Sequence, residues 1–146
     1  MTDTDIKGID ILPHRPPFLF LDRLVGYGKE GSVGQVTFNP EWELFKGHFP
    51  DDPMVPGGIL IEAMAQSAAA GMLVCEREGI YEKTSDIILF AGVDEVEFGR
   101  PVRPGETFET HIDVIRIGHG FARVKATGFV AGERVVEAII RCVAQR

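Results

Sequence analysis

The sequence predicts an α+β fold in which an antiparallel β-sheet wraps around one long, central, apolar helix. Three observations carry this prediction: short strand-like segments come first, one long apolar segment of helical character follows, and strand-like segments with turn signals fill the remainder. A helix that is apolar almost all round must be covered on every side. We therefore expect the sheet to roll around the helix.

The predicted helix runs from about residue 57 to residue 78. It follows Pro56 directly, carries Arg77 in its last turn and meets Gly79, a common helix stop signal. At about 1.5 Å per residue it would be roughly 30 Å long, enough to cross a domain of this size. Many of its side chains are small and would let a curved sheet approach closely: Ala63, Ala65, Ala68, Ala69, Ala70 and Gly71.

Strands are predicted on both sides of this helix. Before it, segments of about 20–28 and 32–39 form short strands around a glycine turn, and residues 1–20 form an extended lead-in. The loop 40–56 contains four prolines and is expected to lack regular structure. After residue 86 an antiparallel meander is expected, with strands at about 87–98, 107–117, 121–130 and 134–144.

Length and charge restrict the class of protein. A chain of 146 residues indicates one domain, residues 1–146, with a single hydrophobic core. The net charge of −7 argues against nucleic-acid binding, which depends on neutralising phosphates. Residues 1–98 carry 7 basic and 17 acidic side chains, and residues 99–146 carry 8 basic and 5 acidic ones. This offset suits a basic patch that faces an acidic partner, although solvated strand faces would produce it too.

Membrane and metal functions are not expected. Glu62, Gln66 and Ser67 interrupt the longest apolar segment, residues 57–75, so no run is expected to reach membrane-spanning length. The acidic start, MTDTDIKGID, lacks the basic-then-apolar pattern of a signal peptide, which predicts a cytoplasmic protein. Cys75 and Cys142 match no metal spacing and are expected to be reduced, packed thiols.

The segment GHFPDDPMVPGGILIEAMAQ, residues 47–66, is the most informative part of the chain. It places His48 in a proline-rich turn and Glu62 inside an otherwise apolar helix. Burying an unpaired carboxylate costs several kcal/mol, so this acid needs a partner or a function. A histidine and a shielded carboxylate together make a proton-transfer pair. From the residues alone, His48 fits a structural role in its loop equally well, and Glu62 also fits an ion pair with an arginine.

This segment resembles the signature of the 3-hydroxyacyl-[acyl-carrier-protein] dehydratases of fatty-acid synthesis, of FabZ type. The similarity extends to LPHRPPFLFLDR at 12–23, to FAGVDEVEFGRPVRPGE at 90–106 and to the final strands, and so covers nearly the whole chain in order. The resemblance implies the hotdog fold, which agrees with the predicted layout. It also implies a homodimer, with dimers that often assemble into hexamers, and a substrate on the phosphopantetheine arm of acyl-carrier protein.

The resemblance implies a role for each residue of the motif. His48 matches the family's catalytic histidine and Glu62 its catalytic acid, and the two residues of one site come from different subunits. Gly57 matches the glycine whose backbone N–H polarises the thioester carbonyl. Gln66, one turn beyond Glu62, is expected to orient the acid. Relatives of FabA type, which also isomerise the double bond, carry aspartate at the position of Glu62, so a plain dehydratase is favoured.

Dehydration explains why these residue types are needed, and it needs neither a metal nor an organic cofactor. Neutral His48 would remove the α-proton. Glu62, its pKa raised by apolar surroundings, would protonate the departing hydroxyl group. The free N–H groups at a helix start would stabilise the negative charge that develops on the thioester oxygen.

Four further residues are assigned to substrate binding, although core packing explains any single one of them as well. These are Phe49, Met54, Pro56 and Phe90. His14, in the LPHR segment, resembles a family position and is expected to pack structurally near the site.

Arg100 and Arg103, in GRPVRPGE, are candidates to meet the phosphopantetheine arm or the acidic carrier protein. Solvated arginines without a partner fit the same sequence. The family tends to carry a lysine where this chain has Gly99, and its loss weakens the docking assignment.

Two other departures concern the substrate more than the reaction. The family usually has Gly-Asn or Gly-Asp where this chain has Asp51-Asp52, and a bulky aliphatic residue where it has Gly58. A dehydratase of a secondary lipid or polyene pathway would fit this pattern. Two other classes stay open: a hotdog thioesterase, in which a helix carboxylate activates water, and a non-catalytic acyl-binding module, which should have lost His48 or Glu62.

Overall fold

The computed structural model describes residues 1–83 and 87–145 of the chain. Its long helix, α2, spans Gly57–Arg77, and two short helices, η1 and α1, span Gly8–Asp10 and Leu44–Gly47. The strands are β1 (Thr2–Lys7), β2 (Arg23–Gly28), β3 (Gly31–Thr37), β4 (Ile88–Phe98), β5 (Thr107–Gly118), β6 (Phe121–Val130) and β7 (Glu133–Ala144).

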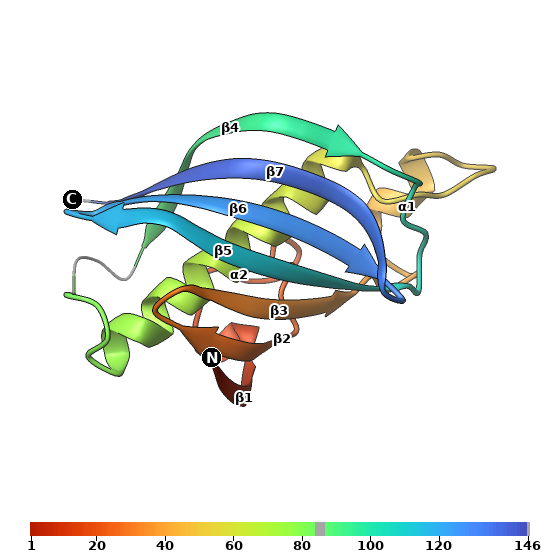
Figure 1. The fold of residues 1–146 in the computed structure, drawn as a ribbon. Coiled ribbons are helices and arrows are strands. Elements are labelled where there is room, and N and C mark those ends of the chain that lie inside the picture. The colour runs from red at the N-terminus through yellow and green to blue at the C-terminus, as the bar shows by residue number, and fades with distance from the viewer. Residues whose placement is uncertain (84–86, 146) are drawn as a thin grey trace.

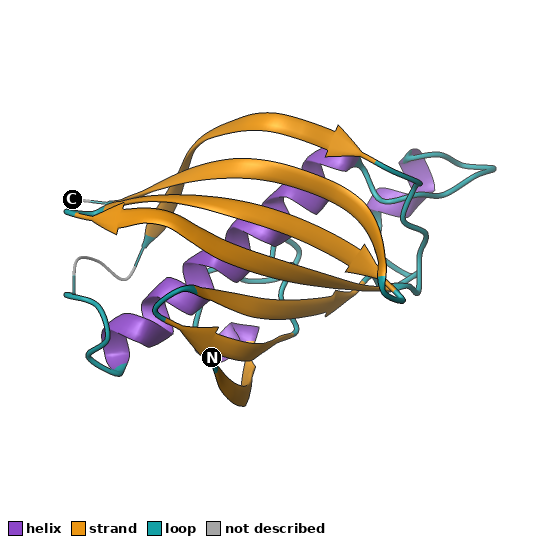
Figure 2. Cartoon of the chain, in the orientation of Figure 1, coloured by secondary structure: helices purple, strands orange, loops and turns teal. Residues whose placement is uncertain are grey.

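The seven strands form one antiparallel sheet in the order β1-β2-β3-β5-β6-β7-β4, so that β1 and β4 are its edges. The sheet curves over α2, which runs diagonally across it (Figure 1). Strands and helix enclose the core between them, and α1 lies beyond the end of the sheet at which α2 begins (Figure 2). The predicted arrangement, a sheet wrapped around one central helix, is confirmed.

Helix α2 is covered on all sides, as its all-round apolar character requires. Fourteen of its residues between Leu60 and Cys75 are buried. One core cluster packs Met64 and Ala68 against side chains of β3, β5, β6 and β7. A second cluster packs Leu73 against Ile11 and Leu21, in the segment that precedes β2. Sheet and lead-in segment therefore enclose the helix from opposite sides.

Small residues bring β3 into close contact with α2 at two points. A Cβ atom added to Gly71 would lie 2.5 Å from the Oγ and Cβ atoms of Ser32, and one added to Gly34 would lie 2.4 Å from Oγ of Ser67. The Ser32 hydroxyl donates a hydrogen bond to the Ser67 carbonyl at 3.3 Å. The expectation that small residues let a curved sheet approach the helix is thereby confirmed.

Three local features differ from the sequence-based prediction. The lead-in contains strand β1, which the pattern does not reveal because its residues, TDTDIK, are mainly polar at a sheet edge. The loop 40–56 contains one helical turn, α1, in the stretch between Pro40 and Pro50 that lacks proline. Only β5, β6 and β7 form a meander, because β5 already pairs with β3 and β6, and β4 pairs with β7 instead.

Helix α2 is long and apolar enough to cross a membrane by length and composition alone, contrary to the expectation from its polar residues. Its many Ala, Leu and Ile residues outweigh Glu62, Gln66 and Ser67 in mean hydropathy. The fold accounts for this composition, because 78% of the most apolar window is buried inside the protein.

The contact between Gly71 and Ser32 generates a stability prediction. Gly71→Ala should lower the free energy of unfolding by about 1–3 kcal/mol, because overpacking against Ser32 outweighs the gain in helix propensity. Chemical unfolding of variant and wild type at matched protein concentration measures the difference. Gly58→Ala is the control in the same helix, since nothing lies within 4 Å of a Cβ atom there. It should leave stability unchanged or raise it by up to about 1 kcal/mol. Equal effects of the two changes would contradict the prediction.

Candidate active site

Glu62 lies in the second turn of α2, next to the buried side chain of Gln66. The Gln66 amide group donates hydrogen bonds to Glu62 Oε2 at 3.2 Å and to the Phe18 carbonyl at 3.0 Å. Its Oε1 atom accepts a hydrogen bond from the Phe20 N–H at 2.7 Å. Gln66 is only 1% exposed, so these partners satisfy polar atoms that water cannot reach. The amide therefore fixes one carboxyl oxygen of Glu62 relative to the segment that covers the helix.

The surroundings of Glu62 favour its protonated form. Burial raises the pKa of Glu62 above its ordinary value of 4.5, while the hydrogen bond from Gln66 and a charge interaction with His14 lower it in part. The net direction is upward, because desolvation penalises the ionised carboxylate most. A carboxyl group whose pKa is raised in this way holds its proton to a higher pH than an exposed glutamate does.

Glu62 faces a cavity of about 380 Å³ that opens beside strand β4. Its wall is largely apolar and includes Phe90, one of the residues assigned to substrate binding. The lining residues are His14, Glu62, Ala65, Gln66, Ala69, Ile88, Leu89, Phe90 and Cys142. Two of them, Ile88 and Cys142, also line a second cavity of about 220 Å³ that extends toward Met72 and Phe121.

For two residues of this cavity, His14 and Cys142, the sequence predicts only a structural role. His14 lines the wall, and its Nδ1 atom is buried without a hydrogen-bond partner among the described residues. Cys142 is buried as expected, and burial, followed by the nearby Glu62 charge, raises the pKa of its thiol to about 11. The LPHR segment was the only sequence signal for His14. Nothing in the sequence around Cys142 pointed to the site.

His48 lies directly after α1, in a tight loop that runs to the start of α2. Its Nδ1 atom lies 3.0 Å from the Met54 carbonyl oxygen, which can only accept a hydrogen bond. A hydrogen therefore sits on Nδ1, and in the neutral form of the ring the lone pair is on Nε2. The ring stacks on Phe49 at a centroid distance of 4.1 Å. Phe49, Met54 and Pro56 all belong to this loop and not to the Glu62 cavity.

The structure does not bring His48 and Glu62 together within one chain. His48 is not among the residues that line the Glu62 cavity, and no hydrogen bond or ion pair joins the two side chains in the described part of the chain. Each residue is held by its own set of contacts. The candidate base and the candidate acid therefore do not contact each other within the described part of one chain.

Gly57 opens α2 with an unpaired backbone donor. The Ile59 and Leu60 N–H groups donate to the Pro56 carbonyl, whereas the Gly57 and Gly58 N–H groups have no acceptor among residues 1–83 and 87–145. Such donors at a helix start attract negative charge. A Cβ atom at Gly57 would lie 2.8 Å from Cζ of Phe98, so the phenyl ring covers the helix start closely.

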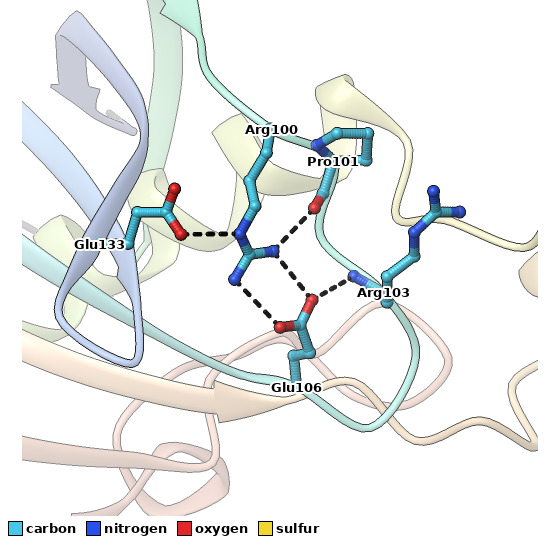
Figure 3. Close-up of polar contacts among 5 residues, drawn as sticks. All are labelled: Arg100, Pro101, Arg103, Glu106 and Glu133. Carbon is cyan, nitrogen blue, oxygen red and sulfur yellow. Dashed lines mark hydrogen bonds and ion pairs between the residues drawn. The ribbon is translucent and has the colours of Figure 1, made fainter.

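The two arginines assigned to carrier docking are both bound within the chain. Arg100 donates to both oxygens of Glu106 at 3.1 Å and to Glu133 at 3.0 Å (Figure 3). Arg103 forms an ion pair with Asp52 and donates to the Pro53 carbonyl at 3.2 Å. Both side chains remain partly exposed, and their role toward a carrier stays a prediction.

A curved sheet around an apolar helix defines a hotdog fold, and the shielded carboxyl group on the helix and the histidine on the loop before it are its candidate acid–base residues. The family model described as "FabA-like domain" matches residues 12–139. The chain belongs to this family.

Curated relatives and solved structures agree with this assignment. A 3-hydroxyacyl-[acyl-carrier-protein] dehydratase FabZ of Pectobacterium atrosepticum is 39% identical over 99% of this chain and 97% of its own length. The FabZ of a Janthinobacterium species is 38% identical over 97% and 91%, respectively. Among solved structures, the dehydratase heterocomplex ApeI:P from Xenorhabdus doucetiae matches with a TM-score of 0.81 at 17% identity, over 97% of this chain and 92% of that chain. The last comparison supports the hotdog fold alone.

The raised pKa of Glu62 predicts a pH-dependent contribution to stability. The folded protein binds this proton more tightly than the unfolded chain does, so the contribution is present below pH 4.5 and is lost as the pH rises through the folded value. Glu62→Gln removes the titration. Its melting temperature should therefore rise relative to wild type between about pH 4 and pH 8, measured by thermal unfolding at several pH values. Glu41→Gln, at an exposed carboxylate, is the control. If the melting temperatures of Glu62→Gln and wild type differed by the same amount at every pH, the prediction would be contradicted.

Proposed function

We propose that this protein dehydrates 3-hydroxyacyl thioesters, carried on acyl-carrier protein, to trans-2-enoyl thioesters in fatty-acid or related lipid biosynthesis. The observation that carries the proposal is Glu62, an acid with a raised pKa in a largely apolar cavity, held by a buried amide. The names of the curated relatives, at 38–39% identity over nearly the whole chain, support the same reaction.

His48 is the proposed base. With its hydrogen on Nδ1 and directed to Met54, its Nε2 lone pair takes the proton from the α-carbon of the substrate. The electron pair of the broken C–H bond moves toward the thioester carbonyl and places negative charge on its oxygen. The Gly57 N–H group, unpaired at the start of α2, is the proposed donor to that oxygen.

Glu62 is the proposed acid. As the enolate collapses, the bond between the β-carbon and its hydroxyl group breaks, and the Glu62 proton converts the leaving hydroxide into water. Gln66 already occupies Oε2 of the carboxyl group, so Oε1 is the oxygen that remains for the substrate. The reaction leaves a trans-2-enoyl thioester, a protonated His48 and an ionised Glu62, and proton exchange with solvent restores both residues.

The proposal includes a homodimer in which His48 of one chain works with Glu62 of the partner subunit. Two observations support this arrangement: no hydrogen bond or ion pair joins the two side chains in the described part of one chain, and His48 is not among the residues that line the Glu62 cavity. Edge strand β4, which pairs only with β7, offers a surface for the second copy: Leu89, Phe90 and Phe98 are exposed there. Assembly of dimers into hexamers is part of the same proposal and follows from the family resemblance.

Further residues are proposed to contact the substrate and the carrier protein. Phe90 would contact the acyl chain in the Glu62 cavity, and Phe49, Met54 and Pro56 would contact the substrate beside His48. Arg100 and Arg103 are the candidates for carrier docking. We propose one catalytic domain, residues 1–146, which the burial of α2 inside the sheet supports. We also propose that the protein is cytoplasmic.

The reaction is tested by following the interconversion of 3-hydroxyacyl and trans-2-enoyl thioesters by absorbance near the enoyl band. His48→Ala and Glu62→Gln should each lower kcat by about 10²–10⁴-fold, because each removes a positioned proton-transfer group. Thiol release is measured in parallel, and intact folding is checked by unfolding curves. Release of free thiol would instead make the protein a thioesterase. Tight acyl binding without turnover on any carrier would make it a binding module.

The shared site is tested by mixing the two inactive variants. If His48 and Glu62 of one site come from different subunits, a heterodimer of His48→Ala and Glu62→Gln carries one intact site. Unfolding and refolding the two together in equal amounts should restore about a quarter of wild-type activity, since half of the dimers are heterodimers with one of two sites intact. Each variant refolded alone is the control. No recovery in the mixture, despite dimers of the expected mass, would place both residues of a site in one chain.

A further inference from the structure

The loop that carries His48 is tied to the loop between β4 and β5 by contacts on both sides of Met54. The Val55 N–H donates to the Val102 carbonyl at 2.8 Å. On the other side of Met54, the Arg103 guanidinium donates to the Pro53 carbonyl at 3.2 Å and forms an ion pair with Asp52. The residues before and after Met54 are thus held by two consecutive residues of the second loop.

Met54 is the residue that fixes the His48 ring. Its carbonyl oxygen accepts the hydrogen bond from Nδ1 at 3.0 Å, and its N–H donates to the His48 carbonyl at 2.9 Å. Within the same loop, Phe49 and Asp52 exchange two backbone hydrogen bonds at 3.3 and 3.0 Å and close a tight turn. The position of the Met54 carbonyl therefore sets the tautomer of the neutral His48 ring and the direction of its Nε2 atom.

Arg103 is itself anchored to a frame of hydrogen bonds and ion pairs. Its backbone N–H donates to Glu106 at 2.7 Å, and both oxygens of Glu106 accept hydrogen bonds from Arg100, which also binds Glu133 in β7. Figure 3 shows that the Arg103 side chain extends away from this cluster while only its backbone joins it. The frame thus fixes the backbone of Arg103, whose side chain reaches Asp52 and Pro53.

We propose that Arg103, paired with Asp52, is a positioning residue for the dehydration: it holds the Met54 carbonyl in place so that His48 presents its Nε2 atom to the substrate. This inference rests on the proposed role of His48 as the base. It assigns to Arg103 a function within its own chain, which is the alternative to the carrier docking proposed above for the same residue, and the two roles predict different kinetics.

The exposure of the pair separates this role from a role in folding. The side chains of Arg103 and Asp52 are 43% and 64% exposed, and ion pairs of that exposure contribute little to stability. Loss of the pair should therefore leave the fold intact. Catalysis is far more sensitive, because a displacement of about 1 Å in a catalytic group can cost on the order of a hundredfold in rate.

The test compares Arg103→Ala with wild type on two substrates, 3-hydroxybutyryl-acyl-carrier protein and the same acyl group on N-acetylcysteamine, which has no carrier. Positioning predicts that kcat falls by about tenfold on both substrates while KM changes little. Arg103→Lys, which keeps the charge, should recover part of kcat. Arg23→Ala is the matched control, because Arg23 is also an exposed arginine paired with an aspartate, Asp5, but lies at the β1–β2 edge. It should behave as wild type.

A double-mutant cycle tests whether the two side chains act together. If Arg103 acts through Asp52, the double variant with Asp52→Ala should lose no more kcat than the more damaged single variant. Losses that multiply would overturn the pairing. A wild-type kcat in Arg103→Ala would overturn the inference, and so would a rise in KM confined to the carrier-linked substrate, which would instead indicate docking.

A parallel measurement of His48→Ala separates this inference from the proposed function on which it rests. If His48→Ala kept wild-type activity, both would be overturned. If His48→Ala were inactive while Arg103→Ala matched wild type, only the role of Arg103 would be overturned. Unfolding curves of all variants should coincide with that of wild type. A loss of kcat then reflects a misplaced His48 ring and not a loss of folded protein.

Discussion

The setting of the proposed acid, Glu62, depends on the buried side chain of Gln66. Its amide binds the backbone of Phe18 and Phe20 and thereby fixes the segment that closes over α2, and the same NH₂ group reaches Glu62. Leaving a buried amide group unpaired costs about 1–3 kcal/mol, so the orientation of Gln66 is set by the fold. The hydrogen bond to Glu62 is therefore made by a side chain whose orientation the contacts with Phe18 and Phe20 already fix.

The proposed base, His48, is held by its own loop and not by the core. His48 is held by hydrogen bonds within its own loop and by contacts of that loop with Val102 and Arg103, most of them at the surface. Exposed contacts add little to global stability and open more readily than core contacts. The proposed acid, Glu62, is thus held by a residue of the core, whereas the proposed base, His48, is held by contacts near the surface.

The sequence predicts what is periodic or local, and it misses what depends on distant pairing. Helix α2 and most strands follow from apolar patterns, and His48, Glu62 and Gln66 follow from one segment of 20 residues. Strand β1 is missed because an edge strand with polar side chains has no apolar alternation. Cys142 reaches the Glu62 cavity only because β7 pairs with β4, a neighbour that the order of elements along the chain does not indicate.

The departures from the family pattern are best explained by their contacts. Gly58 has open space around its Cβ position, so a larger side chain there would fit the fold, and its absence leaves room at the helix start. A Cβ atom at Gly99 would lie 3.2 Å from the Arg134 carbonyl, so glycine relieves a tight contact between β4 and β7. At Asp51-Asp52, the Asp52 side chain pairs with Arg103, 51 residues away, so this acidic group is matched by a basic one in the other loop. None of these residues is itself a hydrogen-bond partner of the His48 or Glu62 side chain, so the departures act at the edges of the site, through the loops and the helix start around the proposed proton-transfer groups.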